Sequence, residues 1–194
     1  MTTLLLMRHG ATEWTQLRRL QGRTDIDLSA EGRQAVLELA PVIETWQPRT
    51  VVCSPLSRTR STAALLGARD VVVDERWAEA GLGQWEGLTP DVIGDDYSRW
   101  RAGLLVPPLG ETPAAVTART TAAVHDAAAQ PGPVLVATHG GVIRAVLAQF
   151  IGLSTGRLVP VAAPSITALD VEPDGSARLR ALNVGARPTE SVPR

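Results

Sequence analysis

The sequence has 194 residues, of which 44% are hydrophobic and 20% charged, the proportions of a globular chain that buries a core. Its 19 basic residues, all arginine, nearly balance 20 acidic residues, and the net charge of −1 disfavours nucleic-acid or membrane-surface binding. Because lysine is absent, a Schiff base and a Walker-type phosphate lysine are excluded.

Short apolar runs that favour β-strands alternate along the chain with patterns that favour helices. A repeated strand–helix order predicts a largely parallel sheet. The strands are expected at Thr3 to Met7, Thr50 to Cys53, Val71 to Val73, Val134 to Thr138 and Ile166 to Val171.

Residues that cap helices stand before three of the four helical patterns. Thr112-Pro113 is the strongest of these starts, since a capping hydroxyl precedes a proline that is preset for the first turn. The predicted helices are Arg33 to Ile43 after Ser29, a helix from Ser54-Pro55 to Leu66, an Ala-rich helix from Thr112-Pro113 to Gln130, and Val142 to Ile151 after His139-Gly140-Gly141.

The chain closes with a predicted hairpin, because Asp174-Gly175 separates two alternating runs, the second at Ala177 to Leu182. We therefore expect an α/β fold, a three-layer α/β/α sandwich whose mostly parallel central sheet carries a C-terminal antiparallel hairpin. Residues 1–184 are expected to form one domain, with a lid or insertion at 88–110 and a flexible tail at 185–194.

Cellular context is also predicted from the sequence. Cys53 is the single cysteine and cannot form an internal disulfide, and the apolar run after Met1 is too short for a signal peptide. No run of 18 apolar residues occurs. We expect a cytoplasmic protein without membrane or nucleic-acid partners. Whether it forms a homodimer stays an open question.

Two histidines occupy matching positions, since His9-Gly10 and His139-Gly140 each follow a predicted strand. The carboxyl ends of parallel strands meet at one edge of a sheet, so both histidines should lie at one mouth. Glycine lets the backbone turn there and bring N–H groups toward an anion. Together with Arg8 and Arg58, which also follow strands, these residues predict a phosphate-binding site.

Further motifs follow in a characteristic order over nearly the whole chain. They are Arg8-His9-Gly10 with Thr12 and Trp14, Gln21-Gly22 and Asp25, Ser54-Pro55 with Arg58 and Thr62-Ala63, Glu79 before Gly83 and Trp85-Glu86-Gly87, Gly110-Glu111-Thr112, and His139-Gly140-Gly141. In this order they resemble the histidine phosphatase superfamily, the phosphoglycerate-mutase-like proteins.

That resemblance implies a role for each matching residue and no cofactor or metal. His9 would be the nucleophile that becomes phosphorylated, Glu79 the proton donor, and His139 a further catalytic group. An imidazolium at His139 would add to the positive charge that stabilises phosphoryl transfer. The residues expected to bind the phosphoryl group are Arg8, Thr15, Gln21, Gly22, Arg58, His139 and Gly140.

Some positions depart from the family pattern or compete for a role. Thr15 stands where an Asn is common and Ala11 where a Glu is common, so we expect altered substrate affinity. Glu75 and Glu86 compete with Glu79 as proton donor, but the spacing to Trp85-Glu86-Gly87 favours Glu79. Arg18 and Arg19 are interpreted as solvated side chains. Whether Trp85 and Trp100 belong to the core or face the substrate stays open.

The predicted function is metal-independent hydrolysis of a small phosphomonoester through a phosphohistidine. Phosphoglycerate mutase, a non-catalytic phosphate-binding protein and a serine esterase are the alternatives, the last from the Gly-x-Ser-x-Gly pattern at 152–156. Only 31 positions separate Glu79 from Gly110, shorter than the insertion of mutases resembling this family, which favours hydrolysis. The net charge of −1 on the lid predicts an organic substrate body in place of a second phosphate.

Overall fold

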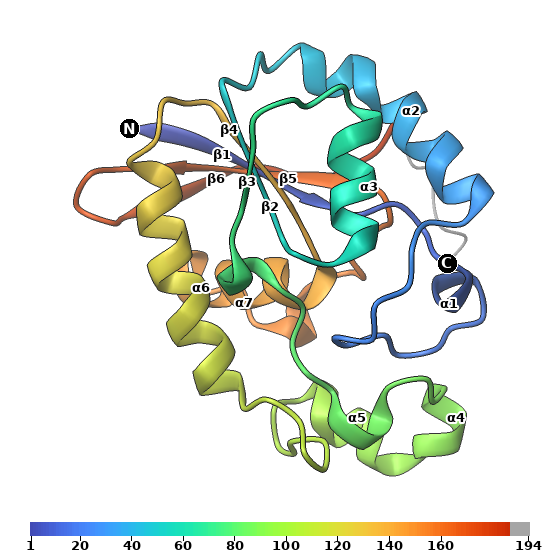
Figure 1. The fold of residues 1–194 in the computed structure, drawn as a ribbon. Helices are drawn as coiled ribbons and strands as arrows, with labels where there is room; N and C mark the ends of the chain where they lie inside the picture. The colour runs from blue at the N-terminus through green and yellow to red at the C-terminus, as the bar shows by residue number, and fades with distance from the viewer. Residues whose placement is uncertain (187–194) are drawn as a thin grey trace.

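The computed structural model describes residues 1–186, which are built around a six-stranded sheet of order β3-β2-β4-β1-β5-β6 (Figure 1). β3, β2, β4 and β1 are paired in parallel, β5 is antiparallel to β1, and β6 is antiparallel to β5. The predicted mostly parallel sheet with a C-terminal antiparallel hairpin is confirmed. The strands are β1 (Thr2–Arg8), β2 (Thr50–Cys53), β3 (Val71–Val73), β4 (Val134–Thr138), β5 (Ser165–Val171) and β6 (Ala177–Val184).

Helices cover both faces of the sheet and make the predicted three-layer sandwich (Figure 1). The longer helices are α2 (Ala30–Glu44), α3 (Ser57–Leu65), α6 (Pro113–Ala128) and α7 (Gly140–Ile151). Successive residues of β1 point to opposite faces, so Leu4 and Leu6 pack with α6 and α7, while Leu5 and Met7 pack with α2. Burial on both sides explains why the central strands are continuous apolar runs.

Most predicted helix starts are confirmed, but that of α3 is wrong. Ser29 and Thr112 cap α2 and α6 through their side chains. α3 begins at Ser57 instead of Ser54-Pro55. The Ser54 hydroxyl bonds to the ring of His139, while the Asp25 carboxylate accepts hydrogen bonds from both the N–H and the hydroxyl of Ser57, each 2.7 Å. A carboxylate distant in sequence therefore satisfies the start of this helix.

The remaining elements are short. α1 (Glu13–Gln16), which the sequence did not predict, begins with a capping box between Thr12 and Thr15. The segment at 88–110 contains α4 (Pro90–Ile93) and α5 (Asp95–Arg101), at the bottom of Figure 1. Three 3₁₀ helices complete the described chain: η1 (Glu75–Trp77), η2 (Gly83–Trp85) and η3 (Thr155–Arg157).

Two sequence features have a clear structural outcome. The Gly-x-Ser-x-Gly pattern at 152–156 follows α7, and Gly152 ends that helix in a left-handed conformation, so the strand-to-helix elbow of a serine hydrolase is not formed. None of the helices between residues 1 and 186 is long and apolar enough to cross a membrane. Of the tail predicted at 185–194, residues 187–194 lie outside the described residues.

The loop after β1 lies directly against the beginning of α2. A Cβ atom at Gly32 would lie 2.0 Å from the carbonyl oxygen of Ala11, far inside van der Waals contact. Glycine at position 32 thus permits the close packing that fixes the loop carrying His9.

Candidate active site

The two histidines meet because their strands are neighbours. In the parallel pairing of β1 with β4, Arg8 lies opposite Thr138, so His9 and His139 leave the sheet side by side. The His9 N–H donates to the Thr138 carbonyl at 3.0 Å. The two imidazole ring centroids are 5.2 Å apart, and both side chains are buried. The structure thus brings together two residues that are 130 positions apart in the sequence.

The contacts of His9 fix which ring nitrogen is free. Its Nδ1 lies 2.7 Å from the Gly10 carbonyl oxygen, which can only accept, so Nδ1 carries the proton and Nε2 the lone pair. Burial, followed by the positive charges of Arg8 and Arg58, holds the pKa of His9 well below its usual value. His9 is therefore a neutral imidazole with a nucleophilic Nε2 at neutral pH.

His139 is neutral as well. Its Nδ1 accepts a hydrogen bond from Arg58 Nε at 3.3 Å, so its Nε2 carries the proton and donates to the Ser54 hydroxyl at 2.8 Å. Burial, and next the charge of Arg58, keeps the pKa of His139 well below its usual value. His139 is thus not the expected imidazolium, because the lone pair on its Nδ1 already accepts a hydrogen bond from the Arg58 guanidinium.

A cavity of about 250 Å³ opens beside His9. Most of the residues predicted to bind or transfer the phosphoryl group line this cavity, whereas Thr15 and His139 do not. The seven that do are Arg8, His9, Gln21, Gly22, Arg58, Glu79 and Gly140.

Arg8 and Arg58 differ in how their guanidinium groups are used. Arg58 donates to the carbonyls of Thr24 and Gly22 at 2.9 and 2.7 Å, and so fixes the loop that contributes Gly22 to the cavity. Arg8 donates to the Val161 carbonyl, while its Nε is buried and unpaired within the described chain. Burial lowers the pKa of both guanidinium groups. An anion in the cavity would supply the acceptor that Arg8 Nε lacks.

Glu79 is held against the first turn of α7. Its Oε1 accepts from the Ala80 N–H at 2.9 Å and its Oε2 from the Gly141 N–H at 3.0 Å. A Cβ at Gly141 would lie 2.2 Å from Oε1, so the carboxylate can approach only because this position is glycine. The N-terminus of α7 was expected to contact an anionic ligand, but its Gly141 N–H donates to Glu79 instead.

The competing carboxylates have other surroundings. Glu86 accepts from the N–H groups of Arg23, Thr24 and Leu82, at 2.9, 2.8 and 3.1 Å, and does not line the cavity. Burial raises the pKa of Glu86, but these bonds and one from the Thr24 hydroxyl lower it below its usual value. Glu86 orients the loop before α2, while Glu75 is exposed in η1.

Thr15 lies behind Gln21 instead of on the cavity wall. Its hydroxyl accepts from the Gln21 side-chain amide at 2.9 Å and contacts the Thr12 hydroxyl at 3.2 Å. Gln21 itself lines the cavity. The structure therefore connects Thr15 to the cavity through Gln21, a relation that the sequence position did not reveal.

Some cavity residues were missed by the sequence analysis, and others were left open or interpreted differently. Arg144 comes from α7, one turn after Gly140, and could have been found from that helical spacing. Trp100 and Tyr97 of α5 also line the cavity, whereas Trp85 is 7% exposed and packs edge-to-face on Trp100, with ring centroids 6.0 Å apart. Arg19, interpreted as solvated, is exposed but lies at the cavity wall.

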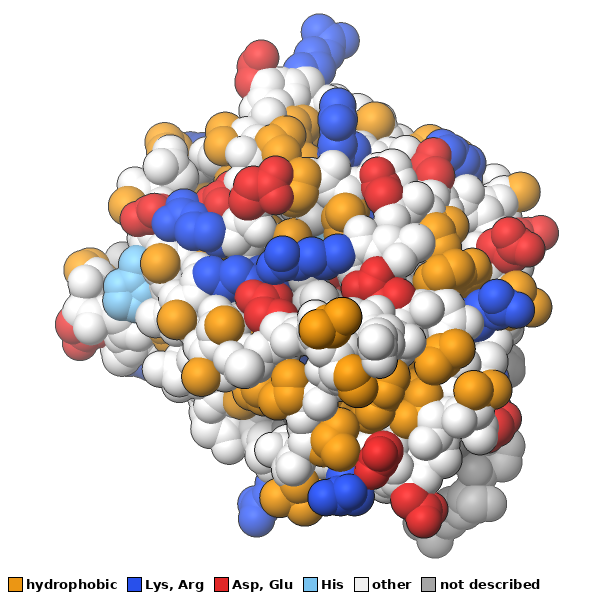
Figure 2. All heavy atoms as spheres, turned by 60° about the horizontal axis from the view of Figure 1, so that its bottom comes forward, with side chains coloured by type: hydrophobic (Ala, Val, Ile, Leu, Met, Phe, Trp, Pro, Cys, Tyr) orange, Lys and Arg blue, Asp and Glu red, His pale blue; other side chains and the backbone are white. Residues whose placement is uncertain are grey.

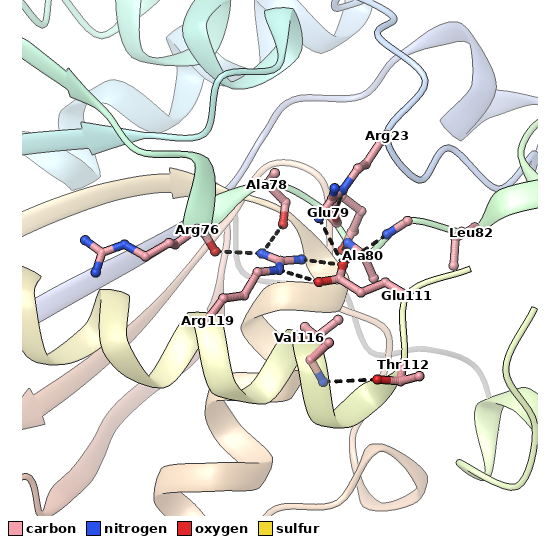
Figure 3. A network of polar contacts seen from close by, with 12 residues as sticks. Arg23, Arg76, Ala78, Glu79, Ala80, Leu82, Glu111, Thr112, Val116 and Arg119 are labelled. Atoms are coloured by element: carbon pink, nitrogen blue, oxygen red, sulfur yellow. Dashed lines mark hydrogen bonds and ion pairs between the residues drawn. The ribbon is translucent and has the colours of Figure 1, made fainter. Parts of the chain in front are cut away.

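A polar network behind Glu79 fixes the segment that carries it (Figure 3). Arg119 of α6 forms a bidentate pair with Glu111, at 2.8 and 3.0 Å, and donates to the carbonyls of Arg76 and Ala78. Arg23 bonds to the same carboxylate at 3.2 Å and to the Glu79 carbonyl at 3.3 Å. The backbone on both sides of Glu79 is thereby anchored to α6.

The face turned forward in Figure 2 carries basic and acidic side chains interspersed among hydrophobic ones. The coloured part of this view shows mixed charge in place of one continuous basic surface. Between residues 1 and 186, no three His, Cys, Asp or Glu side chains gather as metal ligands.

Comparison with known proteins agrees with this geometry. Residues 4–184 match the histidine phosphatase superfamily (branch 1), and the chain belongs to that family. Its class, a phosphoric monoester hydrolase, is therefore the one that the sequence predicted.

Individual relatives carry phosphatase and mutase names. A glucosyl-3-phosphoglycerate phosphatase of Mycolicibacterium vanbaalenii is 34% identical over 172 residues, covering 77% of this chain and 74% of the relative. A probable phosphoglycerate mutase of an Enterobacter species is 30% identical, covering 79% and 76%. The solved mycobacterial glucosyl-3-phosphoglycerate phosphatase in complex with VO3 superposes with a TM-score of 0.86 at 32% identity, covering 95% of this chain and all of the other.

The Arg119 network predicts a positioning effect on Glu79. Arg119→Met should lower kcat/KM for an alkyl phosphate about tenfold but much less for p-nitrophenyl phosphate, since a displaced proton donor matters most for a poor leaving group. It should also lower the free energy of unfolding by about 2 kcal/mol, because Glu111 loses its bidentate partner. Arg99→Met, which breaks only the exposed pair with Asp96, is the control. Equal losses on both substrates would contradict the positioning role.

Proposed function

We propose that this chain hydrolyses small phosphomonoesters through a phosphoryl group carried on His9. One observation supports this most strongly: the free Nε2 of a neutral His9 belongs to a cavity that also contains Arg8, Arg58 and Glu79. Phosphoryl transfer depends mainly on positioning and on charge stabilisation, which a nucleophile between guanidinium groups can provide.

In the first step, His9 Nε2 attacks phosphorus and the P–O bond to the leaving group breaks. Arg8 and Arg58 offset the negative charge of the transferring group. The leaving alkoxide takes a proton from the Glu79 carboxyl.

In the second step, water attacks the phosphohistidine. Glu79, now a carboxylate, accepts a proton from this water as the P–O bond forms and the P–N bond breaks. The electron pair of that bond returns to His9 Nε2, and inorganic phosphate leaves. The cycle uses only side chains of this protein.

Further parts of the proposal concern the domain and the substrate. Residues 1–184 act as one domain in which the segment at 88–110 is a lid, supported by Tyr97 and Trp100 on the cavity wall. These rings suit a small substrate with an organic body. Because a relative is named for glucosyl-3-phosphoglycerate, that compound is the first natural phosphomonoester to assay.

The phosphohistidine can be trapped directly. Denaturing the enzyme during turnover of a ³²P-labelled phosphomonoester should yield an acid-labile, base-stable phosphoprotein, as expected for a P–N bond. The label should be lost in His9→Ala and retained in His125→Ala, a matched control because His125 is exposed and outside the cavity. A base-labile phosphoprotein, or label that survives His9→Ala, would refute the assignment.

The proton-donor role of Glu79 predicts a dependence on the leaving group. Glu79→Gln should lower turnover of an alkyl phosphate by roughly 10² to 10⁴, and that of p-nitrophenyl phosphate much less, because p-nitrophenolate hardly needs a proton. Glu86→Gln is the matched control. If Glu86→Gln shows the selective loss instead, the proton donor has been assigned to the wrong carboxylate.

Hydrolysis should exceed mutase activity by a wide margin, because the short lid leaves water access that a mutase must prevent. A coupled mutase assay with 2- and 3-phosphoglycerate and added 2,3-bisphosphoglycerate should be run beside phosphate release on one preparation. Efficient interconversion with little free phosphate would favour the mutase. Cleavage of p-nitrophenyl acetate without phosphate release would favour the esterase, and release from neither substrate a binding protein.

A further inference from the structure

The cavity holds more positive charge than transfer of one phosphoryl group requires. Its wall contains five arginines, of which Arg8 and Arg58 lie beside His9, and a single carboxylate, Glu79. The other three come from separate elements: Arg19 from the loop after α1, Arg101 from α5 and Arg144 from α7. Of the five charged residues between Leu88 and Gly110, only Arg101 lines the cavity, so the net charge of that segment does not describe the charge at the site.

Arg144, like Arg101, is half-buried, whereas Arg19 is exposed. Burial lowers the pKa of Arg144 to about 10, so the guanidinium stays charged at neutral pH. No ion pair within 4.0 Å involves Arg144 in the described part of the chain. Glu79 is close enough to Arg144 for its charge to raise the pKa of the guanidinium. The hydrogen bonds that the Glu79 oxygens accept come, however, from the N–H groups of Ala80 and Gly141. An enclosed cation without a paired anion is costly unless a ligand supplies one.

Arg144 also stands where two cavities meet. A second cavity, of about 210 Å³, shares Trp100, Arg101 and Arg144 with the first. The rest of its wall is mostly apolar, with residues of α6 and α7 such as Val116 and Ala148, and it also includes Glu111, which is paired with Arg119. A ligand that reaches from His9 past Arg144 would thus place an anionic group at the guanidinium and an uncharged body beyond it.

A carboxylate fits this position better than a second phosphate. The planar fork of a guanidinium matches the two oxygens of a carboxylate. Glu79 lies within electrostatic reach, so a dianion here would be repelled more strongly than a monoanion. The nearby apolar side chains of Leu82 and Trp100 suit a compact anion carried on an organic skeleton.

We propose that Arg144 is a specificity-determining residue that binds a carboxylate of the substrate, so that phosphate esters of hydroxy acids are preferred. The inference rests on the proposed phosphatase function and assigns one residue of the cavity to substrate recognition. It is compatible with the sequence-based expectation of an organic body without a second phosphate.

The test compares 3-phosphoglycerate with glycerol 3-phosphate, which share a skeleton and differ by a carboxylate in place of a hydroxymethyl group. The wild-type kcat/KM should favour 3-phosphoglycerate by about ten- to a hundredfold, the range of one charge-assisted contact. Arg144→Met, which keeps most of the apolar stem, should reduce this ratio to about one, mainly through KM. Arg144→Lys should keep part of the preference, because its charge remains without the fork.

p-Nitrophenyl phosphate, which has no carboxylate, reports on phosphoryl transfer in the same variants. Its kcat/KM should change only a few-fold in Arg144→Met, and Arg178→Met, at an exposed β6 side chain, controls for loss of one positive charge. Equal losses on all three substrates, or a wild type without preference for 3-phosphoglycerate, would overturn the inference but leave the phosphatase intact. A wild type that releases no phosphate from p-nitrophenyl phosphate would refute the proposed function and, with it, this inference.

Discussion

The parallel pairing of β1 with β4 is the constraint on which the rest of the site depends. It places Arg8 opposite Thr138, so the residues that follow both strands emerge at the same edge of the sheet. The Thr138 hydroxyl donates to the Trp77 carbonyl at 2.8 Å, which ties the segment leading to Glu79 to this edge as well. The backbone ladder and this side-chain bond thus set the positions of His9, His139 and the segment that carries Glu79.

Buried charge gives the site its chemical character. Desolvation and neighbouring guanidinium groups keep both imidazoles neutral, which leaves a lone pair on His9. Such a concentration of positive charge in a poorly solvated space is unfavourable by itself. Carbonyl oxygens accept from Arg58, and Glu79 opposes the remaining charge, but the balance of the cavity stays positive. An anionic substrate is therefore attracted by the same charges that keep His9 neutral.

Helix α7 places three residues at the site, because its first turn and its second turn both face the cavity. Gly140 lies on the cavity wall, Gly141 donates to Glu79, and Arg144 reaches the cavity from the next turn. The neighbouring helix α6 holds the Glu79 segment through Arg119. Two helices thus fix the carboxylate and the backbone that carries it, and this rigidity suits the proton transfers proposed for Glu79.

The sequence by itself determined the strands, the caps at Ser29 and Thr112 and the hairpin, because these depend on apolar periodicity and on chemistry within a few neighbouring positions. The residues expected beside His9 followed from the order of the strands and from the resemblance to a known family. Only the tertiary structure decided the start of α3, the place of Thr15 behind Gln21 and the neutral state of His139. The first and the last of these depend on partners that are remote in the chain, Asp25 for α3 and Arg58 for His139. Burial and charge act through space, so a protonation state or a substrate contact is set by which side chains the fold brings together.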